Sequence, residues 1–294
     1  MRSDLPTICV CPACRSQLTW SDAAVDCTGC GAHYRIVADV PVLLVTESPP
    51  GLEERWYTGA PKVVSGRVAG ALGPYRRYLW PPRTYKTMRS RNRVARFAAS
   101  FAEELVVNVG AGETDYGPNV LNLEIEPGPG VDVVGVAERL PLADGCAQAV
   151  ILMAVLEHVQ DAEQTLAEAR RVLAPGGRLL VDAPFIQGYH ASPADYRRFT
   201  EQGLRALLEK QGFEIVESGV AVGPASGMAW VCSEFLALLV SGRSTGAYRL
   251  ARLATRWLTQ PLKYADVWLE RHPMAFTIAS GTWAVASRPR ESPP

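Results

Sequence analysis

The 294-residue sequence lacks an excess of charge of either sign, and it lacks an apolar run long enough to cross a bilayer. Its longest nearly apolar run, residues 228–240, is shorter than a membrane-spanning helix by about one or two turns and contains Glu234. No apolar core of signal-peptide length opens the chain, because Asp4 and Pro6 come first. These absences predict a cytoplasmic protein without a transmembrane helix.

Acidic residues are missing from residues 55–96, which contain 11 Lys or Arg side chains. Aromatic residues interrupt this basic stretch at Trp56, Tyr57, Tyr75, Tyr78, Trp80 and Tyr85. Such a composition suits a phosphate-bearing partner, which could be a nucleic acid, a nucleotide-linked substrate or an anionic membrane surface. The alternative is a solvated linker that packs its aromatic rings on the main domain. We therefore predict a basic aromatic linker or cover segment over residues 47–93.

Four of the seven cysteines form two C-x-x-C pairs separated by twelve residues. Each pair lets one tight turn offer two thiolates to the same ion, and two facing turns complete a tetrahedral zinc site. The predicted ligands are Cys11, Cys14, Cys27 and Cys30. Two disulfides or four free thiols are the alternatives, and a reducing cytoplasm disfavours the disulfides. Because all four positions are thiolates, the zinc is predicted to be structural.

The sequence around these cysteines, "CPACRSQL…CTGCGAHYRIVADVPVLL", resembles the small zinc-ribbon proteins that activate tRNA and protein methyltransferases. The resemblance covers about residues 11–45 and includes both C-x-x-C pairs and the closing "DVPVLL". Val40 replaces the glycine that usually stands in that closing segment. The resemblance implies a zinc ribbon over residues 1–46.

From residue 94 onward, apolar runs of strand length alternate with helical patterns, which predicts a mostly parallel α/β sheet. Strands are expected at residues 105–110, 120–124, 131–136, 147–154, 177–185, 213–221 and 276–287, and helices at 91–104, 161–177 and 200–212. Thr200 is a capping residue before the last of these helices, and Gly212 follows it as a stop signal.

The stretch "VVNVGAGETDYG" places a glycine-rich turn directly after the first of these strands. A nicotinamide or flavin site requires G-x-G-x-x-G, but Asp115 occupies the position of the third glycine after Gly110 and Gly112. Two glycines still allow a close approach to a ligand, and Glu124 at the end of the second strand could hold the two hydroxyls of a ribose.

The downstream sequence "AERLPLADGCAQAVILMAVLEHVQDAEQTLAEARRVLAPGGRLLVDAPF" closely resembles the class I S-adenosylmethionine (SAM)-dependent methyltransferases. The resemblance covers about residues 106–218 and implies a Rossmann-like, mostly parallel seven-stranded sheet that binds SAM. It implies cofactor contacts at Asn108, Gly110, Ala111, Gly112, Glu124, Ala137, Glu138, Leu140, Met153 and Ala154. Asn108 replaces an acid that often precedes the glycine turn, and Val136 replaces an aspartate beside the adenine.

Only eight residues, 111–118, separate the first two strands, whereas a parallel crossover usually needs a dozen or more. The first crossover helix is therefore expected to shrink to about one turn, and "EPGPG" makes the second crossover equally short. We expect the basic aromatic segment and the helix at 91–104 to cover the flank left open. The methyltransferase domain is predicted to span residues 94–288, with a disordered tail at 289–294.

The acceptor is expected beside the loop after the fifth strand, because ligands of open α/β sheets lie at the carboxyl ends of the strands. His190 is the predicted general base, and His158 is the second candidate. A purely structural role for either histidine is the alternative. The predicted substrate contacts are Tyr189, Asp195, Tyr196 and Arg198.

Residues 222–275 form an insert between strands six and seven, with helices expected at 227–240, 247–258 and 261–272. In the second helix Arg249, Arg252 and Arg256 share one face, opposite Leu250, Leu253 and Trp257. Such an insert could cover the acceptor pocket, form a homodimer or lie on a membrane surface.

The sequence predicts a SAM-dependent methyltransferase that methylates an O or N atom of a small or carrier-linked metabolite, such as a glycan, a lipid-linked intermediate or a natural product. The first alternative is an RNA base methyltransferase, which the zinc ribbon and the basic aromatic segment favour. The second alternative is a non-catalytic cofactor-binding or scaffold module, because no residue is an unambiguous base.

Overall fold

The computed structural model describes residues 2–45, 82–112, 114 and 116–290. A seven-stranded sheet forms its centre, in the order β10-β11-β9-β8-β5-β6-β7. The strands are β5 (Val106–Val109), β6 (Val120–Glu124), β7 (Val133–Val134), β8 (Ala147–Met153), β9 (Leu173–Pro184), β10 (Glu214–Val222) and β11 (Gly281–Ser287). Only β11 runs antiparallel to its neighbours β9 and β10. The predicted Rossmann-like fold class is confirmed.

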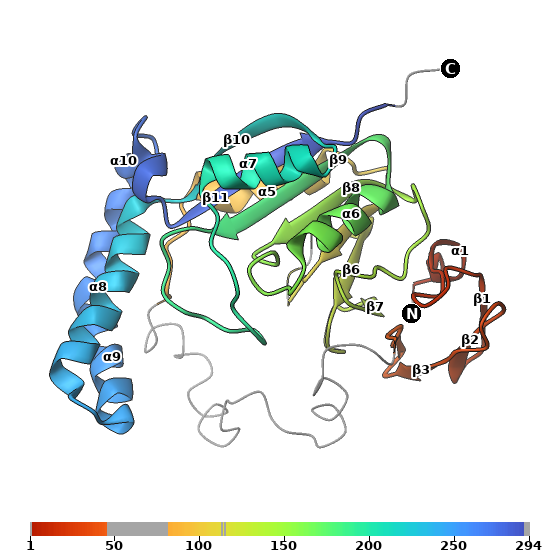
Figure 1. Cartoon of the computed structure of the whole chain (residues 1–294), viewed down its shortest axis with the longest axis horizontal. Helices are drawn as coiled ribbons and strands as arrows, with labels where there is room; N and C mark the ends of the chain where they lie inside the picture. The colour runs from red at the N-terminus through yellow and green to blue at the C-terminus, as the bar shows by residue number, and fades with distance from the viewer. Residues whose placement is uncertain (1, 46–81, 113, 115, 291–294) are drawn as a thin grey trace.

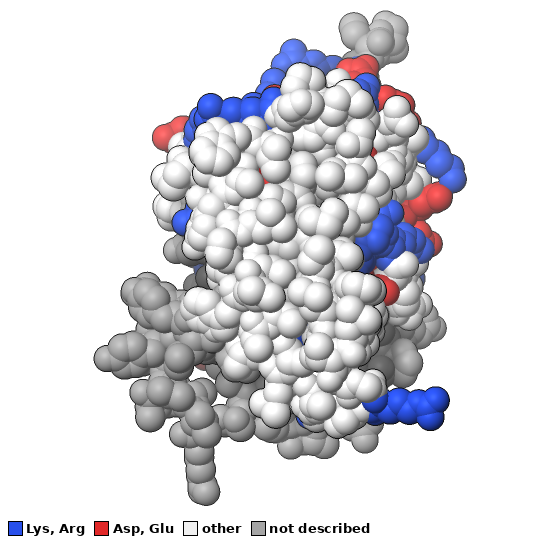
Figure 2. Space-filling model, turned by 90° about the vertical axis from the view of Figure 1, so that its left-hand side faces the viewer, with Lys and Arg blue, Asp and Glu red and all other residues white. Residues whose placement is uncertain are grey.

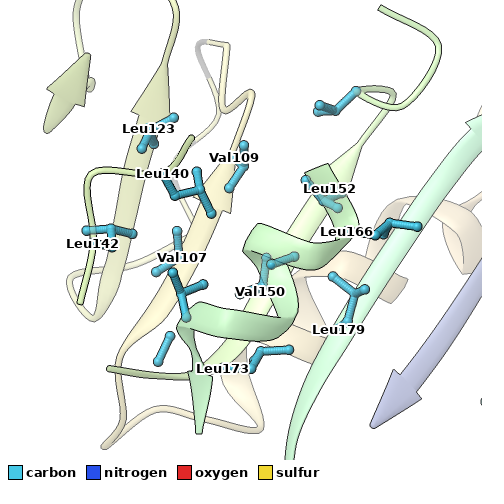
Figure 3. Packing of buried hydrophobic residues seen from close by; sticks show 14 of the residues in the cluster. Val107, Val109, Leu123, Leu140, Leu142, Val150, Leu152, Leu166, Leu173 and Leu179 are labelled. Atoms are coloured by element: carbon cyan, nitrogen blue, oxygen red, sulfur yellow. The ribbon is translucent and has the colours of Figure 1, made fainter. Parts of the chain in front are cut away.

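The central strands are buried on both faces, as expected for parallel strands covered by helices on each side. On one face, α6 (Ala162–Val172) and α7 (Glu201–Lys210) pack over the sheet. Figure 3 shows side chains of β5, β8 and β9, including Val107, Val150 and Leu179, gathered against α6. The helices follow Asp161 and the predicted cap Thr200, whose side chains accept hydrogen bonds from backbone N–H groups in the first turn.

The other face of the sheet is covered by α5 (Met88–Ala99), which buries Val94 and Ala98 against β5, β6 and β8. No helix lies between β5 and β6 in the described residues, so α5, which precedes the sheet in sequence, covers that side. Most of the predicted basic aromatic segment, residues 47–81 of 47–93, lies outside the described residues, as do residue 46 and residues 291–294 of the predicted tail.

The N-terminal residues form α1 (Leu5–Ile8) and a four-stranded sheet of β1 (Leu18–Trp20), β2 (Ala24–Cys27), β3 (His33–Val37) and β4 (Val40–Pro41). This sheet is not an isolated domain, because its apolar residues join the core of the large sheet. Leu43 N donates to Val134 O at 2.9 Å, and Val42 forms a parallel bridge to Val134. The N-terminal unit therefore closes the β7 edge of the large sheet (Figure 1).

At the opposite end, the insert contains α8 (Pro224–Ser241), α9 (Thr245–Thr259), the 3₁₀ turn η2 (Gln260–Ala265), α10 (Asp266–Leu269) and the 3₁₀ turn η3 (Ala275–Ile278). The third helix, predicted at 261–272, is thus broken into a 3₁₀ turn and one short α-helix. Because of this break, Asp266 lies at the start of α8. Its carboxylate accepts hydrogen bonds from the N–H groups of Ala225 and Ser226.

Among the described helices, α8 alone has the length and apolar composition to cross a membrane, although half of its 18 residues are buried against protein. Two strand predictions were too long. The third strand, predicted at 131–136, is only Val133–Val134, and the last begins at Gly281 because residues 275–278 form η3.

Candidate functional site

The four predicted zinc ligands lie together, with their Sγ atoms all within 4.8 Å of one another. Cys11 Sγ is 3.7 Å from Cys30 Sγ, and Cys14 Sγ is 3.4 Å from Cys27 Sγ. Zinc–sulfur bonds of about 2.3 Å in a tetrahedron separate the sulfurs by about 3.8 Å. The N–H groups of Gly29 and Cys30 also point at Cys27 Sγ, as they do around a bound thiolate. The thiol spacing fits a tetrahedral four-thiolate ion site.

A cavity of about 620 Å³ opens at the carboxyl ends of β5, β6 and β8. This volume lies in the usual range for small-molecule sites, about 300 to 1,000 Å³. In the sheet, β6 and β7 lie on one side of β5, and the later strand β8 lies on its other side. The cavity is therefore at the point where the strand order reverses. Ligands of open α/β sheets bind at this position.

The glycine turn after β5 forms one wall of the cavity. Gly110 has a φ of 70°, and a Cβ there would lie 2.5 Å from Val155 Cγ2, so both backbone conformation and space require glycine. Gly112 has a φ of 58°, and a Cβ there would meet nothing within 4 Å. The backbone at Gly112 is therefore open to a ligand.

Glu124, the last residue of β6, faces this turn. Its Oε1 accepts the N–H of Gly112 at 2.8 Å, and its Oε2 accepts the N–H of Ile125 at 2.7 Å. A carboxylate held by two backbone amides at a strand end is well placed to accept hydrogen bonds from a diol.

Six of the ten predicted cofactor residues line the cavity, namely Gly110, Gly112, Glu124, Ala137, Glu138 and Ala154. Ala154 has a φ of 55°, which is unusual for a residue with a Cβ, and its N–H donates to Asp182 O at 2.9 Å. A left-handed alanine costs about 1 to 2 kcal/mol, and such strained positions often lie at functional sites.

The other four predicted cofactor residues do not line this cavity. Asn108 is buried and donates to Asn122 Oδ1 at 3.0 Å. Ala111 and Leu140 are buried, and their N–H groups donate to Leu123 O and Glu168 Oε2. Met153 packs on the α5 face of the sheet, because successive side chains of β8 alternate between the two faces.

The two candidate bases lie together beside the cavity. The imidazole rings of His158 and His190 have centroids 5.2 Å apart, and His158 lines the cavity. Each Nε2 lies 3.7 Å from Oε1 of Glu157, a fully buried carboxylate. This carboxylate raises the pKa of His190 above its ordinary value, against the opposing effect of burial.

Of the four predicted substrate residues, only Tyr196 lines the cavity. Tyr189 is exposed on the loop surface. Asp195 and Arg198 bind one another through a bidentate ion pair, and Asp195 Oδ2 also accepts the N–H of His190 at 2.8 Å. Asp195 and Arg198 thus hold the loop that carries His190.

A known protein family matches the segment that contributes most of the residues lining this cavity. Residues 99–181 match a family model described as a methyltransferase domain. This segment of the chain is therefore similar to methyltransferase domains, including that of a probable SAM-dependent methyltransferase. The matched segment runs from the end of α5 into β9 and includes the glycine turn, Glu124 and Ala154. The N-terminal four-stranded sheet and the helical insert lie outside it.

Two curated relatives match parts of the chain. A ubiquinone/menaquinone biosynthesis C-methyltransferase UbiE of Caulobacter sp. (strain K31) is 42% identical over 69 residues, which are 22% of this chain and 27% of that protein. A probable S-adenosylmethionine-dependent methyltransferase of Mycolicibacterium smegmatis is 37% identical over 108 residues, 34% of this chain and 42% of that protein. The chain thus spans less than half the length of either relative.

Among solved structures, the Burkholderia thailandensis 1,6-didemethyltoxoflavin-N1-methyltransferase is 14% identical with a TM-score of 0.41. The alignment covers 93% of this chain and 100% of that one.

Glu157 lies beside the cavity but was not among the predicted site residues. It belongs to the sequence motif "LEHV", and its burial and its position between two histidines depend on tertiary structure. The adjacent acid and histidine of that motif, together with a histidine in the loop after the next strand, are the signal that could have identified the group.

The Asp195–Arg198 pair predicts an effect of pH on stability. Arg198 lowers the pKa of Asp195 from 3.8 to about 2. The stability gained from this pair is therefore complete above about pH 4 and is lost as the pH falls toward 2. We expect Asp195→Asn to be less stable than wild type at pH 7, with the difference shrinking at pH 3. Urea unfolding followed by circular dichroism measures the free energy of unfolding of both proteins. An equal difference at both pH values would contradict the prediction. Asp22→Asn, on an exposed loop, is the control.

Proposed function

We propose that this protein is a SAM-dependent methyltransferase that transfers a methyl group to an O or N atom of a small or carrier-linked metabolite. One observation carries the proposal. The cavity at the carboxyl ends of β5, β6 and β8 brings a glycine turn open to a ligand together with the Glu124 carboxylate, within the segment that matches the methyltransferase domain.

In this proposal, the turn at Gly110 and Gly112 contacts the methionine part of SAM, and Glu124 accepts hydrogen bonds from the ribose hydroxyls. Ala137 and Glu138, which line the same cavity, flank the adenine. The acceptor enters beside Tyr196 and His158, which line the same cavity. Methyl transfer is an in-line displacement at the sulfonium, so the main task of the protein is to align the acceptor.

The experiment for this function combines binding with transfer. Calorimetry of the purified chain with SAM tests for a cofactor site, and its failure would support a non-catalytic module instead. Incubation with cell extract and isotopically labelled methyl donor, followed by mass spectrometry, then identifies the acceptor. Labelled RNA without a labelled metabolite would support the RNA alternative. Most of the basic segment behind that alternative, residues 55–81, lies outside the described residues.

We also propose that the four clustered cysteines hold a structural zinc ion. The sulfur spacing supports this ion, and the four thiolates leave no position for a substrate. The ion would join the turn after α1 to the turn after β2. Because the ribbon shares its core with the methyltransferase domain, zinc would stabilise the edge of the large sheet as well as the ribbon.

The surface of the insert supports a lipid-linked acceptor. Of the 22 exposed large hydrophobic side chains among the described residues, 17 lie between Met228 and Ile278. They include Phe235, Leu258 and Trp268, and Figure 2 shows the broad uncharged face on this side of the molecule. Monomeric soluble proteins rarely expose apolar patches of this extent without a binding role.

The charges of the insert favour an anionic lipid surface as the partner of this face. Glu234, Asp266 and Glu270 all form hydrogen bonds within the protein, to Tyr248, to the start of α8 and to Thr87. Exposed basic side chains lie on the insert at Arg243, Arg249 and Arg271. Tryptophans and leucines beside arginines are typical of helices that lie in a membrane interface. The predicted cytoplasmic location stays part of this proposal.

Vesicle binding tests the membrane contact. We expect wild type to bind vesicles of phosphatidylglycerol and phosphatidylcholine in a flotation assay. The double variant Leu258→Glu, Trp268→Glu should bind them at least tenfold more weakly. Each charge placed in the membrane interface opposes the binding, and both side chains are more than two-thirds exposed, so the fold is preserved. Val216→Glu, on exposed β10, is the control. A wild-type dimer that the double variant converts to monomer, without vesicle binding, would show that the face is a homodimer interface.

A further inference from the structure

Three potential metal ligands converge beside the cofactor cavity. The side chains of Glu157, His158 and His190 each offer one donor atom, and the three atoms lie within 4.8 Å of one another. Glu157 and His158 come from the turn between β8 and α6, and His190 comes from the loop after β9. The Asp195–Arg198 ion pair holds that loop.

Hydrogen bonds set the tautomer of both histidines. Nδ1 of His158 lies within hydrogen-bond distance of Ala194 O, and Nδ1 of His190 is 3.0 Å from Gly188 O. A carbonyl oxygen can only accept, so each Nδ1 carries a proton that it donates. In a neutral ring, each Nε2 then faces Glu157 with a lone pair. Histidines that bind metals are oriented in this way, with the second ring nitrogen donating to a backbone carbonyl or carboxylate.

The carboxylate between the two rings lacks a hydrogen bond. Glu157 is fully buried, and neither of its side-chain oxygens accepts a hydrogen bond from any described residue. A buried carboxylate without such a bond is costly, and two lone pairs pointing at it increase the cost. A cation among the three donor atoms would satisfy all of them.

We propose that Glu157, His158 and His190 bind one divalent transition-metal ion. Two imidazole nitrogens and one carboxylate suit Zn²⁺ or Fe²⁺ and leave coordination positions open, whereas Mg²⁺ and Ca²⁺ prefer oxygen ligands. Metal–ligand bonds of about 2.1 Å separate tetrahedral donors by about 3.4 Å. Each Nε2 is 3.7 Å from Glu157 Oε1, so small side-chain movements complete the site.

The role of this ion rests on the proposed methyltransferase function. Because His158 lines the cavity, the ion lies at the cavity wall, where an acceptor hydroxyl can become its next ligand. Binding to a divalent ion lowers the pKa of the hydroxyl, whose proton passes to solvent. The oxygen then forms a bond to the methyl carbon as the carbon–sulfur bond breaks, and that electron pair stays on sulfur, giving S-adenosylhomocysteine. In this arrangement the histidines are ligands, and neither acts as a single general base.

Cobalt is the probe for this site. The 294-residue chain is purified with zinc at the four-cysteine cluster. It is then titrated with Co²⁺, and visible absorption is recorded. We expect one Co²⁺ to bind per chain and to give ligand-field bands without a sulfur-to-cobalt charge-transfer band. A charge-transfer band would show that Co²⁺ had replaced the metal at the four cysteines. Glu157→Gln, which keeps the shape of the side chain, and His190→Gln should each weaken this binding at least tenfold. His272→Gln, at an exposed histidine outside the site, is the control.

The outcomes separate this inference from the proposed function. Calorimetry with SAM is carried out on the same samples, and circular dichroism checks that the variants are folded. SAM binding without Co²⁺ binding, or equal Co²⁺ binding by wild type and Glu157→Gln, would overturn the metal site and leave the methyltransferase proposal standing. If a proton on one imidazole satisfies Glu157 instead, wild type will bind no Co²⁺ and Glu157→Gln will lower the pKa of that histidine in an NMR titration.

Discussion

Glu124→Ala is expected to weaken the binding of SAM by about 10- to 100-fold, because hydrogen bonds to a charged group contribute about 1.5 to 3 kcal/mol. The carboxylate lies at the end of β6 with its oxygens already directed to the glycine turn, so it needs little rearrangement to accept the ribose hydroxyls. Calorimetry with SAM measures the loss. Glu209→Ala, on the exposed face of α7, removes the same charge at a distance and should leave the affinity unchanged.

The same carboxylate also holds the N–H groups of Gly112 and Ile125, so its loss could act through the turn alone. Glu124→Gln separates the two effects, because its amide keeps one acceptor oxygen for the turn and removes the charge. If Glu124 holds the ribose, Glu124→Gln will bind SAM more weakly than wild type even though it keeps one of the two backbone hydrogen bonds of the carboxylate. Unchanged affinity in both variants would show that the ribose lies elsewhere.

Removing the zinc ion proposed for the four-cysteine cluster is expected to destabilise the large sheet as well as the N-terminal sheet. Binding of structural zinc contributes about 10 to 16 kcal/mol in isolated zinc-finger peptides. Because the unfolded chain lacks the site, this binding free energy stabilises only the folded state. Here the ribbon shares one hydrophobic core with the large sheet. We expect chelation, or Cys11→Ser with Cys27→Ser, to lower the melting temperature by at least roughly 10 °C, because a loss of about 3 to 5 kcal/mol, well below that binding free energy, is sufficient for such a shift. Scanning calorimetry measures the shift.

The control for the ribbon is Cys232→Ser, because this thiol lies on α8, outside the cluster. Metal analysis of each sample should show one zinc ion fewer in the double variant than in the control. A separate low-temperature transition for the ribbon, with the main transition unchanged, would contradict the shared core. The Co²⁺ experiment does not depend on this outcome, because sulfur-to-cobalt charge transfer identifies the ribbon site.

Local patterns were sufficient for much of the fold. Buried parallel strands appear in the sequence as continuous apolar runs, so residues 106–109, 120–124 and 147–153 were located closely. The cap at Thr200 was predicted correctly because a capping side chain acts only three residues away. The four ribbon cysteines were equally readable, since one turn sets the spacing of each pair.

The predictions that differed from the structure depended on partners distant in sequence. The third insert helix breaks at a point where Asp266 caps α8, some forty residues earlier in the chain. Asn108 forms a hydrogen bond with Asn122 in the next strand and so does not face the cavity. Hydrophobic periodicity contains no information about such contacts.

By itself, the sequence determined the order of strands and helices, the four-cysteine cluster and the glycine turn followed by an acid, because each depends on residues within a few positions of one another. Tertiary structure alone decided that the ribbon completes the sheet edge at Val134 and that the insert presents an apolar face. It also brought His190 to within 3.7 Å of the buried Glu157 carboxylate. Parallel strands bring their carboxyl ends together at one edge of the sheet, so residues that are distant in the chain meet there.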